Sequence, residues 1–157
     1  MGIILKGLQR VPWGDLEVPR GSATDIPTLL SKAAWSGRDT GGLADLVCEL
    51  GFVISEATAP TVPFLLELAG APHVACKPEV LKLLLDIYSS HEWSHSAADA
   101  LPKYADNYTH QVQWEIDAHE AVLTDRQIIE GLTDSIDPDV AGAASRLLDT
   151  IDAEANR

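Results

Sequence analysis

Apolar residues recur at intervals of three and four along much of the chain, which is the spacing of one face of an α-helix. The first such stripe follows Ala23-Thr24-Asp25-Ile26-Pro27, where Thr24 or Asp25 is a suitable N-cap and Pro27 falls in the first turn. A second helix is predicted from Asp39 or Thr40 as far as Ile54. Its stripe consists of Leu43, Leu46, Val47, Leu50, Val53 and Ile54, with Cys48 and Phe52 on the opposite face.

Two further helices are predicted in the middle of the chain. Pro60 and Pro63 restrict the start of the helix that carries Phe64-Leu65-Leu66, and Gly70-Ala71-Pro72 ends it. Pro78 opens the next helix, in which apolar residues cover most of the circumference as far as Tyr88. A helix that is apolar nearly all round is buried between other helices, so we expect residues 78–88 at the centre of the domain.

The pattern breaks between Ser89 and Tyr108, a stretch rich in Ser, His, Asp and Tyr. It predicts a long polar loop over residues 89–108, with a short helix at 96–105 as the alternative. The remaining pattern predicts helices from about Thr109 to Val122, Asp125 to Thr133 and Asp137 to Ala153. Residues 1–22 contain two prolines and several glycines and are expected to be irregular. We therefore expect one all-α domain of about seven helices over residues 1–157.

The last predicted helix begins at Asp137-Pro138 and carries an alanine-rich apolar stripe up to Ile151, which resembles the second helix of a HEAT repeat. Thr58–Ala69, and Trp13 followed by Gly21–Leu30, resemble phrases of bacterial HEAT-repeat-like proteins of poorly defined function. The chain departs from that pattern in two places. It has Gly51-Phe52-Val53 where such proteins often carry His-Gln-Gly, and it has Ala141 where HEAT repeats often carry Arg.

This resemblance implies an α-α superhelix of HEAT-like helical repeats, a solenoid of helix pairs about 40 residues apart. Solenoids mostly bind other macromolecules. The resemblance implies no enzymatic activity, because a fold alone does not fix a function.

Charge narrows the class of partner. The 157 residues carry a net charge of −13, and 46% of them are hydrophobic, as expected for a folded protein. Twelve of the 24 acidic residues lie in the last third, where only Arg126, Arg146 and Arg157 oppose them. Phosphate backbones would be repelled, so we expect no nucleic-acid partner. A basic protein would be attracted.

The sequence shows no targeting segment and no cysteine motif that would change this picture. Ile3-Ile4-Leu5 is too short for the apolar core of a secretory signal, and no apolar run approaches the ~20 residues of a membrane helix. Cys48 and Cys76 have no C-x-x-C spacing, so reduced thiols in a cytoplasmic protein are expected.

One catalytic string is present. His91-Glu92-Trp93-Ser94-His95 matches H-E-x-x-H, in which two histidines one helical turn apart hold zinc and the glutamate acts as general base. Here it stands at the edge of the predicted loop, and neither Glu115 nor Glu120 is singled out as a third ligand. We therefore expect no metal, no cofactor and no catalytic residue.

Protein interfaces draw most of their binding energy from Trp, Tyr and Arg. The candidate partner-binding residues combine aromatic anchors with an acidic segment: Trp93, Tyr104, Tyr108, Trp114, Glu115, Asp117 and Glu120. The function expected is a non-catalytic protein-binding module, in its narrowest form an immunity protein that neutralises a basic toxin. The alternatives are a general scaffold or assembly adaptor and a metal-dependent hydrolase using His91 and His95.

Overall fold

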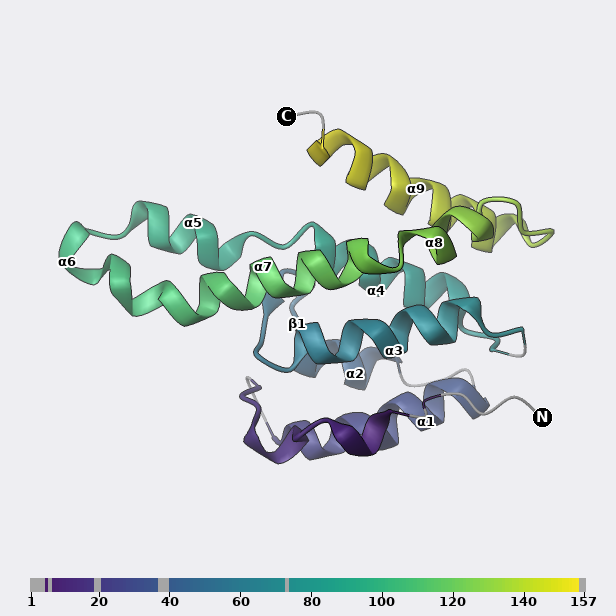
Figure 1. Ribbon diagram of the computed structural model, residues 1–157, viewed down its shortest axis with the longest axis horizontal. Coiled ribbons are helices and arrows are strands. Elements are labelled where there is room, and N and C mark those ends of the chain that lie inside the picture. Colours follow the sequence, from purple (N-terminus) through teal and green to yellow (C-terminus); the bar gives the residue numbers. More distant parts are fainter. Residues whose placement is uncertain (1–4, 6, 19–20, 37–39, 73, 156–157) are drawn as a thin grey trace.

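The computed structural model describes residues 5, 7–18, 21–36, 40–72 and 74–155, and over these residues the protein is all-α, as predicted (Figure 1). The α-helices are α1 (Ile26–Ser36), α2 (Thr40–Val47), α3 (Thr58–Gly70), α4 (Lys77–Tyr88), α5 (Glu92–Asp99), α6 (Pro102–Ala105), α7 (Thr109–Thr124), α8 (Arg126–Leu132) and α9 (Pro138–Ala155). Short 3-10 turns cover η1 (Leu8–Arg10), η2 (Trp13–Asp15), η3 (Ala23–Asp25) and η4 (Asp106–Tyr108). The described helices include none with the length and hydropathy of a membrane span.

The helices form layers around α3 and α4. Helix α3 packs against α4, α7 and α8, and it also contacts α1 and α2 (Figure 1). Helix α4 packs against α9. The apolar residues of α4 enter the core, and Val80, Leu81 and Leu84 are fully buried. The central position predicted for residues 78–88 therefore holds for these side chains. Glu79 and Lys82 face solvent instead, so α4 has one open side.

The N-terminal segment is irregular, as predicted, and it is fastened by Trp13. The indole Nε1–H of Trp13 donates to the Leu8 carbonyl at 2.8 Å. Its ring is buried and lies 6.2 Å from the ring of Phe64 in α3. The segment thus covers α3 as well as leading into α1.

The second predicted helix is wrong beyond Val47. Residues Cys48–Glu49 (β1) and Val53–Ile54 (β2) form a two-stranded antiparallel hairpin in which Cys48 pairs with Ile54. Leu50 and Gly51 at its turn have positive φ angles of 58° and 84°. Two such residues in succession reverse the chain and end the helix, although the apolar spacing continues through them. The reversal buries Cys48 and exposes Phe52.

The predicted polar loop over residues 89–108 is also wrong, because most of it is helical. Helices α5 and α6 and the turn η4 run out along α7 and form a helical hairpin with it. We call residues 92–120 the arm. Figure 1 shows the arm projecting past the ends of α3 and α4. Neither α5 nor α6 contains a buried residue, so these two helices lack the apolar stripe that sequence patterns detect.

Candidate functional site

The structure separates the seven predicted partner-binding residues into three environments. Tyr104 is exposed near the end of the arm, and Asp117 and Glu120 are exposed on α7. Trp93, Tyr108 and Trp114 are half-buried. Glu115 is buried, with 1% of its surface exposed. All of them belong to the arm, but they do not form one continuous exposed surface.

Glu115 is a structural carboxylate, which corrects its assignment to an exposed acidic face. Its Oε2 accepts the backbone N–H of Trp93 at 2.8 Å. Its Oε1 accepts the backbone N–H of Ser94 at 3.0 Å and the Ser94 hydroxyl at 2.7 Å. These N–H groups belong to the first turn of α5, where a helix has no internal acceptors and where negative charge is favoured. Glu115 therefore caps α5 from the neighbouring helix α7.

Trp93 joins the arm to the body of the protein. Its indole Nε1–H donates to the carbonyl of Ile54 at 2.7 Å, and its ring lies 6.2 Å from that of Tyr108. Trp93 and Trp114 both pack against the hydrophobic core. These two indoles thus hold the arm in place, and the surface open to a partner has to come from other residues.

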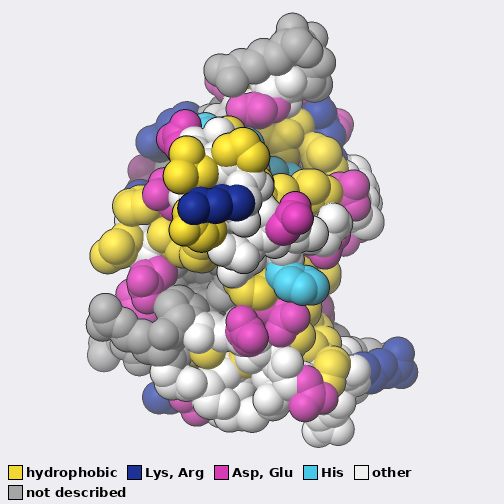
Figure 2. Space-filling view, turned by 90° about the vertical axis from the view of Figure 1, so that its left-hand side faces the viewer, with side chains coloured by type: hydrophobic (Ala, Val, Ile, Leu, Met, Phe, Trp, Pro, Cys, Tyr) yellow, Lys and Arg dark blue, Asp and Glu magenta, His cyan; other side chains and the backbone are white. Residues whose placement is uncertain are grey.

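The exposed apolar side chains of the arm include two that the sequence reasoning did not single out. Leu101 is 61% exposed and precedes α6, Tyr104 within α6 is 48% exposed, and Ile116 is exposed on α7. The ammonium of Lys103 lies 5.0 Å from the centre of the Tyr104 ring. Figure 2 views the end of the arm and shows hydrophobic side chains gathered around a basic one, with acidic side chains nearby. The sequence offers one indication that Leu101 is exposed, which is its place beside Pro102 in a polar segment.

Three histidines meet at the base of the arm. His91 stands at the N-cap of α5, and the His95 amide donates to the His91 carbonyl, so the H-E-x-x-H string lies at a helix start and not in a loop. The ring of His91 lies 6.1 Å from that of His95 and 5.0 Å from that of His119. Within the described part of the chain, no group of three or more His, Cys, Asp or Glu side chains is arranged to hold a metal ion.

The surroundings of His119 disfavour its charged form. A ring nitrogen of His119 donates to the Ser90 carbonyl at 3.0 Å, and the ring lies 5.4 Å from that of Tyr88. Burial lowers the pKa of His119, and the neighbouring His91 lowers it further. His91 Nε2 in turn lies 3.9 Å from Glu154 Oε1 of α9. The cluster thus connects α4, α5, α7 and α9.

Both cysteines are buried and free. Burial raises the pKa of Cys48 to about 11 and also raises the pKa of Cys76. At neutral pH each is therefore a protonated thiol, which is a poor nucleophile and a poor metal ligand.

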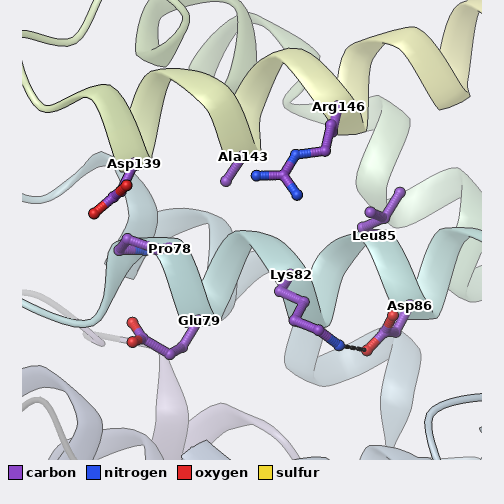
Figure 3. Close-up of a pocket in the computed structure, with 8 residues that line it drawn as sticks. All are labelled: Pro78, Glu79, Lys82, Leu85, Asp86, Asp139, Ala143 and Arg146. Carbon is purple, nitrogen blue, oxygen red and sulfur yellow. Dashed lines mark hydrogen bonds and ion pairs between the residues drawn. The ribbon is translucent and has the colours of Figure 1, made fainter.

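A groove runs along the open side of α4, between α4 and α9 (Figure 3). Its cavity volume is about 390 Å³. The lining residues come from both helices: Pro78, Glu79, Lys82, Leu85, Asp86, Asp139, Ala143 and Arg146. Three apolar side chains lie along it, the Arg146 side chain reaches into it from α9, and the other charged side chains stand around it.

Comparisons with protein-family models, with curated proteins and with solved structures found no match to this chain. The resemblance to HEAT-repeat-like proteins, and the superhelical stacking that it implies, therefore stay predictions.

Proposed function

We propose that the protein is a non-catalytic binding module whose arm docks onto a basic protein. The observation that carries this proposal is the exposure of Leu101 and Tyr104 near the end of a helical hairpin that projects from the body. Apolar side chains in this position contribute little to folding, because α5 and α6 bury no residue. Exposed aromatic and apolar groups set within a polar rim are typical of protein interfaces.

Charge supports a basic partner. The arm, residues 92–120, carries six carboxylates and one lysine. With Glu115 buried, Asp99, Asp106, Asp117 and Glu120 are among the carboxylates that face solvent. Their field speeds the approach of a cationic surface, and the apolar residues then hold it. In its narrowest form, the proposed function is that of an immunity-type protein that blocks a basic toxin. A general scaffold would use the same surface.

The test begins with the partner captured by the full-length protein, whose affinity is then measured against paired variants. Leu101→Ser combined with Tyr104→Ser should weaken binding by about tenfold or more, mainly through faster dissociation. The matched control is Ile136→Ser, which removes a fully exposed apolar side chain outside the arm. Equal affinities for the two variants would show that the arm is not the docking surface. Inhibition of the partner's own activity distinguishes an immunity protein from a scaffold.

The hydrolase alternative depends on metal at His91 and His95. Their rings are adjacent, which is the observation in its favour. A third ligand is required for a catalytic zinc, and the described residues offer no suitable group. We expect elemental analysis of the purified protein to find no stoichiometric zinc. One zinc per chain, lost in a His91→Ala variant, would support the hydrolase instead.

A further inference from the structure

Arg146 in the groove between α4 and α9 has no carboxylate partner in the described part of the chain. Its Nε–H donates to the Gly142 carbonyl at a long 3.4 Å, and Figure 3 shows the guanidinium reaching from α9 toward α4. Arg126, by comparison, bonds both Glu130 and Asp152. In a chain with 24 acidic and 11 basic residues, a guanidinium left over a groove is available to a carboxylate from outside.

Opposite charges occupy different parts of this groove. Glu79 and Asp139 stand together where α4 and α9 begin, on either side of Pro78 (Figure 3). Lys82 and Arg146 stand further along the two helices. Asp86 is the carboxylate at this end of the groove, and it is paired with Lys82 at 3.0 Å. An i,i+4 pair on the surface of a helix is weak and opens readily.

This arrangement selects the charge of a ligand. Three carboxylates and two cations line the groove, so a dianion such as phosphate meets repulsion from Glu79, Asp86 and Asp139. A ligand with only positive charges leaves Arg146 without a carboxylate to bond. A ligand with one positive and one negative end matches both parts of the groove. Ala143 lies between the acidic and basic positions to contact its aliphatic part, while Pro78 stands at the acidic end and Leu85 lies beyond Lys82.

The helices also set the distance between the two charges of that ligand. At a rise of 1.5 Å per residue, the acidic and basic positions are separated by about 4.5 Å along α4 and by about 10.5 Å along α9. An extended peptide advances about 3.3 Å per residue and its side chains alternate between two faces, so side chains two residues apart lie on one face and about 7 Å apart.

We propose that this groove binds an extended peptide segment that carries a basic side chain and a carboxylate two residues apart. The basic side chain lies between Glu79 and Asp139, and the carboxylate accepts hydrogen bonds from Arg146. This site is separate from the arm, so it stands whether or not the arm docks a partner.

The test uses the ¹⁵N-labelled full chain and four blocked tripeptides, with amide chemical shifts as the readout. The bipolar probes are acetyl-Lys-Ala-Glu-amide and acetyl-Glu-Ala-Lys-amide, which cover both directions along the groove. The controls are the corresponding peptides with two lysines or with two glutamates. We expect at least one bipolar probe to shift the amides of residues 78–86 and 139–146 saturably, with a Kd on the order of 1 mM.

Variants then assign the binding to the groove. Arg146→Gln should weaken the better bipolar probe by about tenfold or more, since it removes the charged donor. Lys103→Gln makes the same change of net charge near the end of the arm and should leave the affinity unchanged. The proposal is overturned by the absence of saturable shifts with both bipolar probes, by an equal response to the two-lysine peptide, or by unchanged affinity in Arg146→Gln.

Discussion

Glu115 shows how much one buried carboxylate contributes to this protein. It accepts three hydrogen bonds from Trp93 and Ser94 and joins α5 to α7. Because neither α5 nor α6 contains a fully buried side chain, these polar contacts act together with the packing of Trp93 to hold α5 in place. The prediction that the acidic residues of α7 form an exposed docking surface is therefore wrong for Glu115.

Replacing Glu115 should destabilise the protein strongly. Glu115→Ala leaves the Trp93 and Ser94 donors without an acceptor, and we expect the free energy of unfolding to fall by about 2–4 kcal/mol. Asp117→Ala, which removes an exposed carboxylate two residues away, should change it by no more than about 0.5 kcal/mol. Urea unfolding followed by circular dichroism measures both. Equal stability of the two variants would contradict the capping role.

His119 should make stability depend on pH. Burial and His91 place its folded pKa below 6.5, the value of the free imidazole. The unfolded chain then binds this proton more tightly, so the contribution is present above pH 6.5 and is lost as the pH falls below it, by about 1.4 kcal/mol per unit of pKa displacement. The pH dependence also reflects the groups that lie near the His119 ring or near His91, which are Tyr88, His91, Glu115 and Glu154.

The measurement compares unfolding free energies at pH 7.5 and 5.5 in the parent protein and in His119→Gln, which keeps a donor for the Ser90 carbonyl. We expect the parent to lose more stability than the variant on acidification. His110→Gln is the control because that ring is exposed on the arm. A parent and a His119→Gln variant with the same pH dependence would rule out this titration.

Among the elements, the β1–β2 hairpin has the least usual sequence for its shape. The Phe52 amide donates to the Glu49 carbonyl at 3.1 Å, and both central residues, Leu50 and Gly51, have positive φ. These are the features of a type I′ turn, which favours Asn-Gly. This conformation costs Leu50 about 1–2 kcal/mol of backbone strain. The side chain is exposed, so packing does not offset the strain.

Changes at this turn should therefore alter stability in opposite directions. Leu50→Asn should raise the free energy of unfolding by about 0.5–1 kcal/mol, because asparagine tolerates the left-handed region. Gly51→Ala should lower it by about 1 kcal/mol, since only glycine adopts φ 84° without strain. Thermal unfolding of the two variants beside the parent reports both signs. A destabilised Leu50→Asn variant would mean that the leucine makes contacts that offset its strain.

At the scale of the whole molecule, shape and charge combine. The body is built around α3 and α4, and the arm extends from it with most of its charged residues acidic. Side chains that fold the arm and side chains that it exposes alternate along α7: Glu115 and Ala118 are buried, while Ile116 and Asp117 are exposed. Docking and folding can therefore be tested by different substitutions.

Charge reversal on the exposed side of α7 should slow association with a basic partner. Asp117→Lys with Glu120→Lys is expected to lower the association rate by about tenfold at low ionic strength and to weaken its salt dependence, with helix content unchanged. Glu115 is left intact because it caps α5. Asp134→Lys with Asp149→Lys makes the same change of net charge at exposed sites outside the arm and should have a smaller effect. Equal effects of the two pairs would place the attraction in the overall charge and not in the arm.

The sequence by itself determined the helical class and the position of most helices. Pro27, Pro78 and Pro138 fall in or just before the first turns of α1, α4 and α9, and Gly70 ends α3. These are local effects, because proline and glycine act on their own backbone and an apolar stripe records which face a helix buries. The aromatic and acidic composition of the arm can also be read from the sequence, because composition does not depend on the fold.

Only the tertiary structure decided which of those residues are accessible. Glu115 and Asp117 look alike in the sequence, yet one caps a helix 21–22 residues earlier in the chain and the other faces solvent. The polar loop predicted over residues 89–108 is helical because α5 is held by hydrogen bonds to Glu115 and by the packing of Trp93, and not by a periodic apolar face. Contacts of this kind, and the groove over Arg146, exist only after separate helices have been brought side by side, so no local pattern encodes them.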